Sequence, residues 1–281
     1  MRFKVIHNTE YQFSNDVFFE PHYLRLKPRN TSFLELKSFN LEIAPNPAGI
    51  SEQADPENNF IHFCWFNNTH NKMEIRLQFE VESKDFNPFN FLIHPIKYSE
   101  VPFKYSPDLE KILKPSLKRK KLDEPVIEYG NEILKKSEQK TINFLANLTQ
   151  AIHLDFKLEI RLIGKPYHPN ELFRLKNGSC RDLAWMQIQI LRNLGFASRF
   201  VSGYYYFDAE NPEFELHAWL EVFIPGAGWI GLDPSHGMLA GNAHIPVASS
   251  ANYQNTMPVS GSVRGDATSE LKNDLNIEIV K

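Results

Sequence analysis

The first hundred residues alternate between apolar and polar positions, which is the pattern of strands with one buried face. The alternation is clear in FKVIHNTEYQF at 3–13 and FLELKSFNLEIAP at 33–45, and it returns in FIHFCWF at 60–66 and MEIRLQFEVES at 73–83. The Pro-, Asn- and Asp-rich stretch PNPAGISEQADPENN between the second and third segments is typical of turns. We therefore expect a β-rich N-terminal domain over residues 1–105.

Helical spacing appears after a charged connector at 106–136 that mixes prolines with short helical patterns. From residue 137 onward, with Ser137 as the expected N-cap, apolar side chains recur at Ile142, Leu145, Leu148 and Ile152. A second apolar helix, LAWMQIQILRNLGF, ends in Asn193 and Gly195, which suit a C-terminal cap.

The chain becomes strand-like again after this second helix. The segments SRFVSGYYYF, ELHAWLEVFI and GWIGLDPS have strand patterns, and PGAG at 225–228 predicts a hairpin loop between the last two. A helix-then-sheet domain is thus expected over 137–250, and a C-terminal segment over 251–281 that ends in the short strand LNIEIV. The whole chain is predicted to be an α+β protein.

Composition narrows the function classes. The net charge of −3 disfavours a nucleic-acid partner, which usually requires a basic surface. No apolar run approaches the ~20 residues that span a bilayer, and the N-terminus has no signal-peptide core. We therefore expect a cytoplasmic protein without a membrane partner. The two cysteines, Cys64 and Cys180, are expected to be free thiols, Cys64 as a core residue.

Cys180 lies in NGSCRDLAWM, at or just before the start of the second helix. The positive end of a helix favours a thiolate, and its free backbone N–H groups can stabilise an oxyanion. Asp182 falls in the first turn, where a carboxylate satisfies free amides. Gly178 permits a tight entry to the helix. This pattern is typical of a nucleophilic cysteine, although a lone cysteine before a helix is more often structural.

A base and an orienting group are available from the predicted hairpin. His217 and Asp233 each lie eight residues from Pro225, so an antiparallel hairpin would place them opposite each other on one face. A one-residue slip would put them on opposite faces.

His236 is a competing base but more plausible at the pocket rim, and His244 is expected near the same face. Cys180, His217 and Asp233 include zinc-ligand types, but no HExxH pair is present, so no metal and no cofactor are expected. We also see no tight carboxylate-rich calcium loop.

Three segments together resemble the bacterial transglutaminase-like proteins, which belong to a papain-like superfamily of cysteine hydrolases and acyltransferases. They are GSCRDLAWMQIQILRNLGFASRFVSGY, LHAWLEVFIPGAGWIGLDPSHG and, in the β-rich region, YQFSNDVFFEPHYLRLKPRN. The resemblance implies an N-terminal antiparallel β domain and a papain-like core, in which a Cys-bearing helix packs on an antiparallel sheet that carries the His and Asp. It also implies a catalytic triad of Cys180, His217 and Asp233.

The resemblance leaves the second oxyanion donor unassigned. Phe144 has no donor, and the candidates for this donor or for the pocket are Asn147, His153, Tyr167, His168, Asp182, Trp219 and His236. The expected activity is hydrolysis of a protein or peptide amide through a thioester, with transamidation as the alternative outcome. Two other functions remain open at this stage: a catalytically idle peptide-binding module, and a structural partner of another enzyme. The natural substrate, calcium dependence and oligomeric state do not follow from the sequence.

Overall fold

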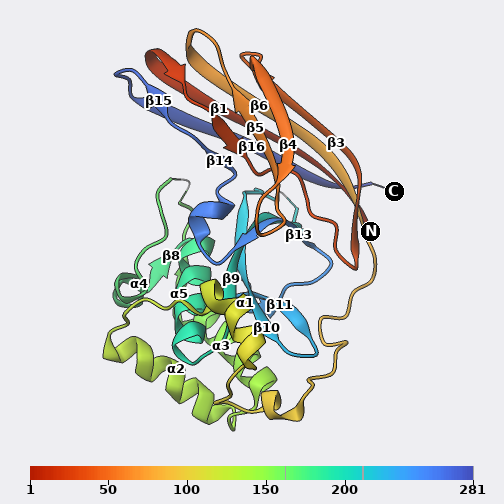
Figure 1. Ribbon diagram of the computed structural model, residues 1–281, viewed down its shortest axis with the longest axis vertical. Coiled ribbons are helices and arrows are strands. Elements are labelled where there is room, and N and C mark those ends of the chain that lie inside the picture. The colour runs from red at the N-terminus through yellow and green to blue at the C-terminus, as the bar shows by residue number, and fades with distance from the viewer. Residues whose placement is uncertain (162, 211, 281) are drawn as a thin grey trace.

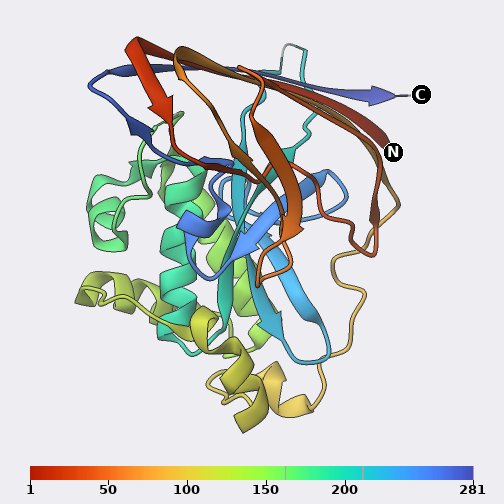
Figure 2. The ribbon, with the colours of Figure 1, turned by 45° about the horizontal axis from the view of Figure 1, so that its top comes forward.

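The computed structural model describes residues 1–161, 163–210 and 212–280. Two packed β-sheets occupy one end of the molecule and are built from the N-terminal strands together with the last strands of the chain (Figure 1). A third sheet and the helices form the other end, and the two views agree on this division (Figure 2). The N- and C-termini both lie on the β-only part.

The β-only part is a sandwich of two antiparallel sheets. In the first sheet β1 pairs with β6 on one side and with β15 and β16 on the other, and β6 pairs with β3. The second sheet has the order β14-β2-β5-β4. These strands span Arg2–Phe19 (β1), His22–Leu24 (β2), Leu34–Ala44 (β3), Gly49–Ala54 (β4), Phe60–Trp65 (β5), Thr69–Ser83 (β6), Val259–Ser260 (β14), Val263–Arg264 (β15) and Ser269–Val280 (β16).

The period-two pattern of the sequence produces the core of this sandwich. Phe3 and Val5 of β1 are fully buried, as are Phe79 and Val81 of β6, while the residues between them are at most half-buried. Alternate side chains therefore fill the space between the sheets. Cys64 is 1% exposed in this core, as its apolar surroundings in the sequence predict.

Two strands of the sandwich differ from the sequence expectation. β4 lies within the stretch expected to be turns, because an edge strand with exposed side chains carries no apolar alternation. The C-terminal strand, expected only over LNIEIV, runs from Ser269 to Val280 and pairs along β1.

The third sheet has the order β12-β11-β10-β9-β13, and all its pairs are antiparallel. Its strands span Ser198–Tyr205 (β9), His217–Ile224 (β10), Gly228–Asp233 (β11), Met238–Leu239 (β12) and His244–Ser250 (β13). Helix α5 (Cys180–Asn193) packs against β9 and β10. Its residues from Asp182 to Arg192 are all buried, so α5 is the central helix of this part. The predicted α+β arrangement of a cysteine-bearing helix on an antiparallel sheet is present.

The remaining helices surround α5. They are α1 (Pro107–Leu117), α2 (Glu124–Lys136), α3 (Thr141–Asp155), α4 (Pro169–Leu175), and two short 3-10 helices, η1 (Ile96–Ser99) and η2 (Tyr253–Thr256); β7 (Lys157–Leu158) and β8 (Asn177–Gly178) form a small parallel pair. The region expected as a connector therefore contains two helices, and Val126 and Ile133 of α2 join the core around α5. Among the residues described, no helix is both long and apolar enough to cross a bilayer.

The expected N-cap at Ser137 is wrong. Lys140 precedes α3, whereas Ser137 follows α2 and its hydroxyl donates to the carbonyl of Ile133 at 2.8 Å. Both the backbone N–H and the hydroxyl of Ser137 donate to this carbonyl in the last turn of α2, so the serine closes one helix instead of capping the start of the next. Short-range patterns cannot distinguish these two uses when helices follow each other closely.

The two parts share a continuous core. Tyr204 of β9 is fully buried, and with Ile245 and Val247 of β13 it belongs to the same apolar cluster as the sandwich. Polar bonds also cross the junction. The Asn59 side chain exchanges two hydrogen bonds with the backbone of Ser249, at 3.0 and 2.8 Å. The sandwich is therefore packed directly behind β9 and β13.

His7 is a buried titratable group at this junction. Its Nδ1 lies 3.1 Å from the hydroxyl of Tyr204, and the residue is 3% exposed. Burial lowers the pKa of His7 from 6.5 to about 4, against weaker opposing effects of Asn273 and Asp274. The folded protein then binds fewer protons than the unfolded chain between these two values, so the free energy of unfolding falls as the pH drops from 6.5 toward 4.

We predict that His7→Gln removes this component of acid sensitivity. The wild type should lose about 2–3 kcal/mol from His7 between pH 7.5 and pH 4.5, and the variant should lack that loss. Urea unfolding at both pH values measures the difference. His70→Gln, which changes a more exposed histidine of the same sandwich, is the control. An identical pH dependence in wild type and His7→Gln would contradict the assignment.

Candidate functional site

Cys180 is the first residue of α5 and is partly exposed. Local chemistry starts the helix at this point. The carboxylate of Asp182 accepts hydrogen bonds from the backbone N–H and the hydroxyl of Ser179, at 2.8 and 2.6 Å. Gly178 suits the position before it, because a Cβ there would lie 2.7 Å from Cδ1 of Leu172 and 3.0 Å from Cβ of Asp182. The sulfur is thereby placed at the positive end of a central helix.

Asp182 also attaches the preceding loop to the start of α5. It is fully buried, and its second oxygen accepts from the backbone N–H of Tyr167 at 2.7 Å and from the guanidinium of Arg161 at 2.6 Å. The Arg161 guanidinium also lies 4.0 Å from the centre of the Tyr167 ring. Asp182 is therefore an organiser of the cysteine loop and has no position left for an incoming substrate.

The hairpin that carries His217 and Asp233 has a different register from the expected one. Ile224 pairs with Gly228, and the pairing continues to Leu220 opposite Leu232. One further step would set Asp233 opposite Trp219, two residues away from His217. The expectation that His217 and Asp233 are directly opposite is therefore wrong. An offset of two keeps both on one face, and diagonal neighbours remain within reach of long side chains.

His217 and Asp233 form a short buried pair. The Nε2 of His217 lies 2.7 Å from Oδ2 of Asp233, and the side chains are 10% and 0% exposed. Cys180 also interacts with His217 and favours its charged form. Since Nε2 is occupied by the carboxylate, Nδ1 is the nitrogen left for the sulfur.

The pair is ionic. Burial opposes a charge on His217, but the charge of Asp233 and the hydrogen bond to it, together with the interactions of Cys180, raise the pKa of His217 to about 10. Burial likewise opposes a charge on Asp233, and the charge and hydrogen bond of His217 outweigh it and hold the pKa of Asp233 well below its usual range. The imidazolium form therefore prevails at neutral pH.

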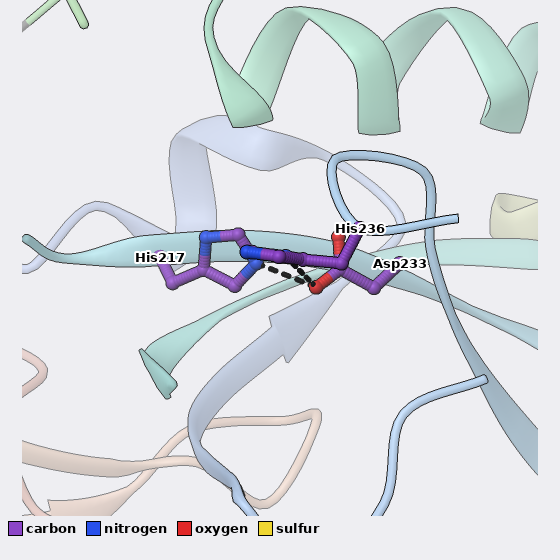
Figure 3. Close-up of side chains that lie close together, drawn as sticks. All are labelled: His217, Asp233 and His236. Carbon is purple, nitrogen blue, oxygen red and sulfur yellow. Dashed lines mark hydrogen bonds and ion pairs between the residues drawn. The ribbon is translucent and has the colours of Figure 1, made fainter. Parts of the chain in front are cut away.

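Two further imidazoles approach the same carboxylate oxygen. His236 Nδ1 and His244 Nε2 lie 2.9 and 3.1 Å from Oδ2 of Asp233. Figure 3 shows the bonds from His217 and His236 converging on this oxygen. The other oxygen accepts from the backbone N–H of Ser235 at 2.9 Å. The carboxylate is thus enclosed by donors.

The roles of the two extra histidines differ. The Nδ1 of His244 accepts the backbone N–H of Gly241 at 3.1 Å, so its proton is on Nε2 and points at Asp233. His244 is 2% exposed, and burial lowers its pKa, which keeps the ring neutral. The side chain of His236 is 29% exposed and lies on the turn after β11. His236 is therefore the solvent-facing member of the cluster.

Two aromatic rings border the histidines. The Tyr205 ring centre lies 4.4 Å from those of both His236 and His244 and 5.6 Å from that of His217. Trp219 is 2% exposed and stacks on His217 at 6.0 Å. These rings restrict how the imidazoles can rotate.

The other sequence candidates lie elsewhere or have structural partners. Asn147 is exposed on α3 and donates to the hydroxyl of Ser137 at 2.9 Å. His153 contacts the backbone carbonyl of Ser235 through Nδ1 at 2.8 Å, so it supports the turn behind Asp233. His168 caps α4, where its Nδ1 accepts from the backbone of Asn170. The backbone N–H of Cys180 lies at the start of α5, where the first N–H groups have no partner within the helix.

Tyr205 is not predicted from the sequence, and His244 is predicted only to lie near the same face. The strand register is what places Tyr205 and His244 beside His217. His217 pairs with Gly203, which places Tyr205 two residues further along the same face, and His244 pairs with Tyr205. The pairing of β9 with β13 crosses a long sequence interval, however, and local patterning does not reveal such pairs.

The arrangement brings together a thiol, an imidazolium and a buried carboxylate at the start of a helix. These groups can provide a nucleophile, a proton shuttle and an orienting charge. The ligand atoms of His217, Asp233 and His236 also lie within 4.8 Å of one another, and nitrogen and carboxylate oxygen are ligand types that divalent transition metals accept.

Comparisons with known proteins agree with this architecture. Residues 3–82 match the bacterial transglutaminase-like N-terminal region, and residues 127–234 match the transglutaminase-like superfamily. An uncharacterized protein of Mycobacterium tuberculosis is 24% identical over 296 residues, which cover 99% of this chain and 92% of that protein. An uncharacterized protein of Mycobacterium leprae is 29% identical over 109 residues, 37% of this chain and 38% of that protein.

A solved structure shows the same fold. The crystal structure of a candidate cysteine protease from Cytophaga hutchinsonii superposes with a TM-score of 0.71 at 18% identity, over 100% of this chain and 92% of that one. The two matched regions correspond to the β-sandwich and to the part that contains α5 and the β10–β11 hairpin. The chain therefore belongs to the transglutaminase-like superfamily, with the bacterial transglutaminase-like N-terminal region followed by a core of papain-like fold.

Proposed function

We propose that this protein is a cysteine-dependent amide hydrolase whose catalytic residues are Cys180, His217 and Asp233. One observation carries the proposal. A cysteine at the first position of a central helix interacts with an imidazole, whose Nε2 lies 2.7 Å from a fully buried carboxylate. Membership of the superfamily supports the same general kind of chemistry.

The nucleophile is the thiolate of Cys180, because a thiol attacks a carbonyl carbon only weakly. His217 either takes the proton of the thiol or balances a charge that has already formed. The sulfur attacks the carbonyl carbon of an amide, and the oxyanion that forms accepts the backbone N–H of Cys180. His217 gives its Nδ1 proton to the leaving amine, the C–N bond breaks, and a thioester remains on Cys180.

Water completes the cycle. His217, now neutral, accepts a proton from the water as it attacks the thioester, and the acid product leaves as the sulfur regains its charge. Asp233 fixes the imidazole so that Nδ1 faces the sulfur throughout, and it stabilises the charged ring before and after each proton transfer. A primary amine in place of water would give transamidation by the same steps. We favour hydrolysis because water is always present at a partly exposed thiol.

The same residues could persist in a binding module without turnover. The ionic state of His217 argues against such a role, since a buried charge pair costs desolvation energy that a binding surface would not require. Protein and peptide amides are the substrate class that we propose, and a cytoplasmic location remains our expectation.

The reactivity of the two cysteines provides the first test. Cys180 should react with iodoacetamide at pH 6.5, and His217→Ala should slow this reaction roughly ten- to a hundredfold by removing the imidazolium. Burial raises the pKa of the Cys64 thiol to about 11, so Cys64 should stay slow in the same molecule. Peptide mass spectrometry reads both sites.

His168→Ala, which removes an exposed histidine that caps α4, is the matched control for labelling and should leave the Cys180 rate unchanged. If Cys180 and Cys64 react slowly and alike, or if His217→Ala has no effect, then the thiol is not activated and the proposed mechanism fails.

Turnover provides the second test. Fluorescent casein and a panel of peptide amides report hydrolysis, and incorporation of a biotinylated primary amine reports transamidation. Cys180→Ala should abolish both, while Asp233→Asn should lower kcat by about 10²–10⁴-fold because the imidazole loses its charge partner and its orientation. Asp208→Asn, on an exposed loop, is the control. Residual turnover in Cys180→Ala equal to that of the wild type would exclude Cys180 as the nucleophile.

A further inference from the structure

The three imidazoles around Asp233 are more than a cysteine mechanism requires. The proposed chemistry uses His217 alone, yet His236 and His244 lie at 2.9 and 3.1 Å from the same oxygen. His236 differs from the other two because part of its side chain faces solvent. This leaves a route by which a small cation can reach the carboxylate.

We propose that His217, Asp233 and His236 bind a divalent transition-metal ion, with zinc as the best fit, and that the bound ion switches the site off. Imidazole nitrogen and carboxylate oxygen are ligands that Zn²⁺ prefers. The two imidazole nitrogens lie 2.7 and 2.9 Å from Oδ2, and all three ligand atoms lie within 4.8 Å of one another. This site is distinct from one built on the sulfur of Cys180.

The ligand atoms must rearrange to admit the ion, since both nitrogens are too close to Oδ2 and lie within 4.8 Å of each other. Zinc–ligand distances of ~2.0–2.2 Å place two ligands of a tetrahedral site roughly 3.4 Å apart. Each nitrogen must therefore move away from Oδ2 by about 0.5–0.7 Å. His236 can move because it lies on the turn between β11 and β12. Water can fill the fourth position on the exposed side.

His244 remains an outer partner of the carboxylate. Its Nδ1 is occupied by the backbone N–H of Gly241, so its Nε2 proton continues to point at Asp233. Such a donor orients a carboxylate ligand without binding the metal itself. Three protein ligands and one open position then describe the site.

The proton balance explains why the ion inactivates the enzyme. Two coordinate bonds form to nitrogen and one to Oδ2, and no covalent bond breaks apart from N–H. His217 releases its Nε2 proton to solvent and keeps the proton on Nδ1, which faces Cys180. On His236 the proton moves from Nδ1 to the exposed Nε2. The Nε2–Asp233 hydrogen bond is lost, and the neutral, metal-bound ring no longer places a positive charge beside the sulfur. Transfer of its remaining Nδ1 proton to the leaving amine would leave a metal-bound imidazolate, so the ring is a poor acid in the step that forms the thioester.

Metal binding can be tested without turnover, in the Cys180→Ala variant of the full chain. Isothermal titration with Zn²⁺ in a non-chelating buffer should show one ion bound per chain. Adding His236→Ala should weaken binding at least about tenfold, the loss that even an outer-shell change can cause. His94→Ala in the same background removes an exposed histidine far along the chain and should leave the affinity unchanged.

Binding of Co²⁺ distinguishes this site from one that includes the sulfur of Cys180. With Co²⁺ the wild-type protein should show visible ligand-field bands without a near-ultraviolet thiolate-to-cobalt band. A thiolate band, together with loss of binding in Cys180→Ala, would place the ion on Cys180 and overturn the proposal. Equal zinc affinity with and without His236, or no binding in Cys180→Ala, would also overturn it.

Two controls keep these outcomes interpretable. Circular dichroism and the metal-free Tm should be unchanged in His236→Ala, and His236→Gln serves as a second variant if the first is destabilised. The binding result does not depend on the proposed function, since Cys180→Ala is inactive by design. If zinc inhibits turnover of the wild type but not of His236→Ala, metal binding at this site is what inhibits the proposed activity.

Discussion

The carboxylate of Asp233 is the constraint on which the site depends. A charge with no exposure to water is costly unless it is paired and fully hydrogen-bonded. Here one oxygen accepts the backbone of Ser235 and the other is surrounded by three imidazoles. This one group therefore fixes the end of β11, the turn that follows it and the orientation of His217.

The fold brings these groups together by using both faces of the same strands. Tyr204 of β9 faces the sandwich and contacts His7, while its neighbour Tyr205 faces the histidine cluster. β13 repeats the arrangement, with His244 at Asp233 and Ile245 in the sandwich core. The N-terminal sandwich is thus the packing support behind the sheet that carries the site. Its loss would expose the back of β9 and β13 and leave His244 without a fixed position.

The parts of the structure that local patterns encode were predictable. Alternation gave β1, β3, β5 and β6, and helical spacing with a Gly-Ser entry gave α5 with Cys180 at its start. The prediction that His217 and Asp233 lie on the same face of the β10–β11 hairpin was also correct, because an offset of two residues keeps both side chains on that face. The direct pairing of His217 with Asp233 was wrong because the loop closes at Ile224 and Gly228, a detail that turn sequence alone did not fix.

The rest required contacts between distant segments. β4 is an exposed edge strand, so it has no apolar pattern to detect. The convergence of His236 and His244 on one oxygen depends on the turn after β11 and on the pairing of β9 with β13, which no short motif encodes. Ser137 shows the same limit at smaller scale, since it ends α2 although its type and position suited the start of α3.

The protonation state of His217 tests the buried ion pair with Asp233 most directly. Nitrogen-15 NMR of the imidazole rings, with His217→Gln to assign the signal, reports whether both nitrogens carry protons. We expect a His217 imidazolium at pH 8 that loses its proton only as the pH approaches about 10, and that becomes neutral near pH 7 in Asp233→Asn. A His217 ring that is already neutral at pH 7 in the wild type would contradict the buried His217–Asp233 ion pair.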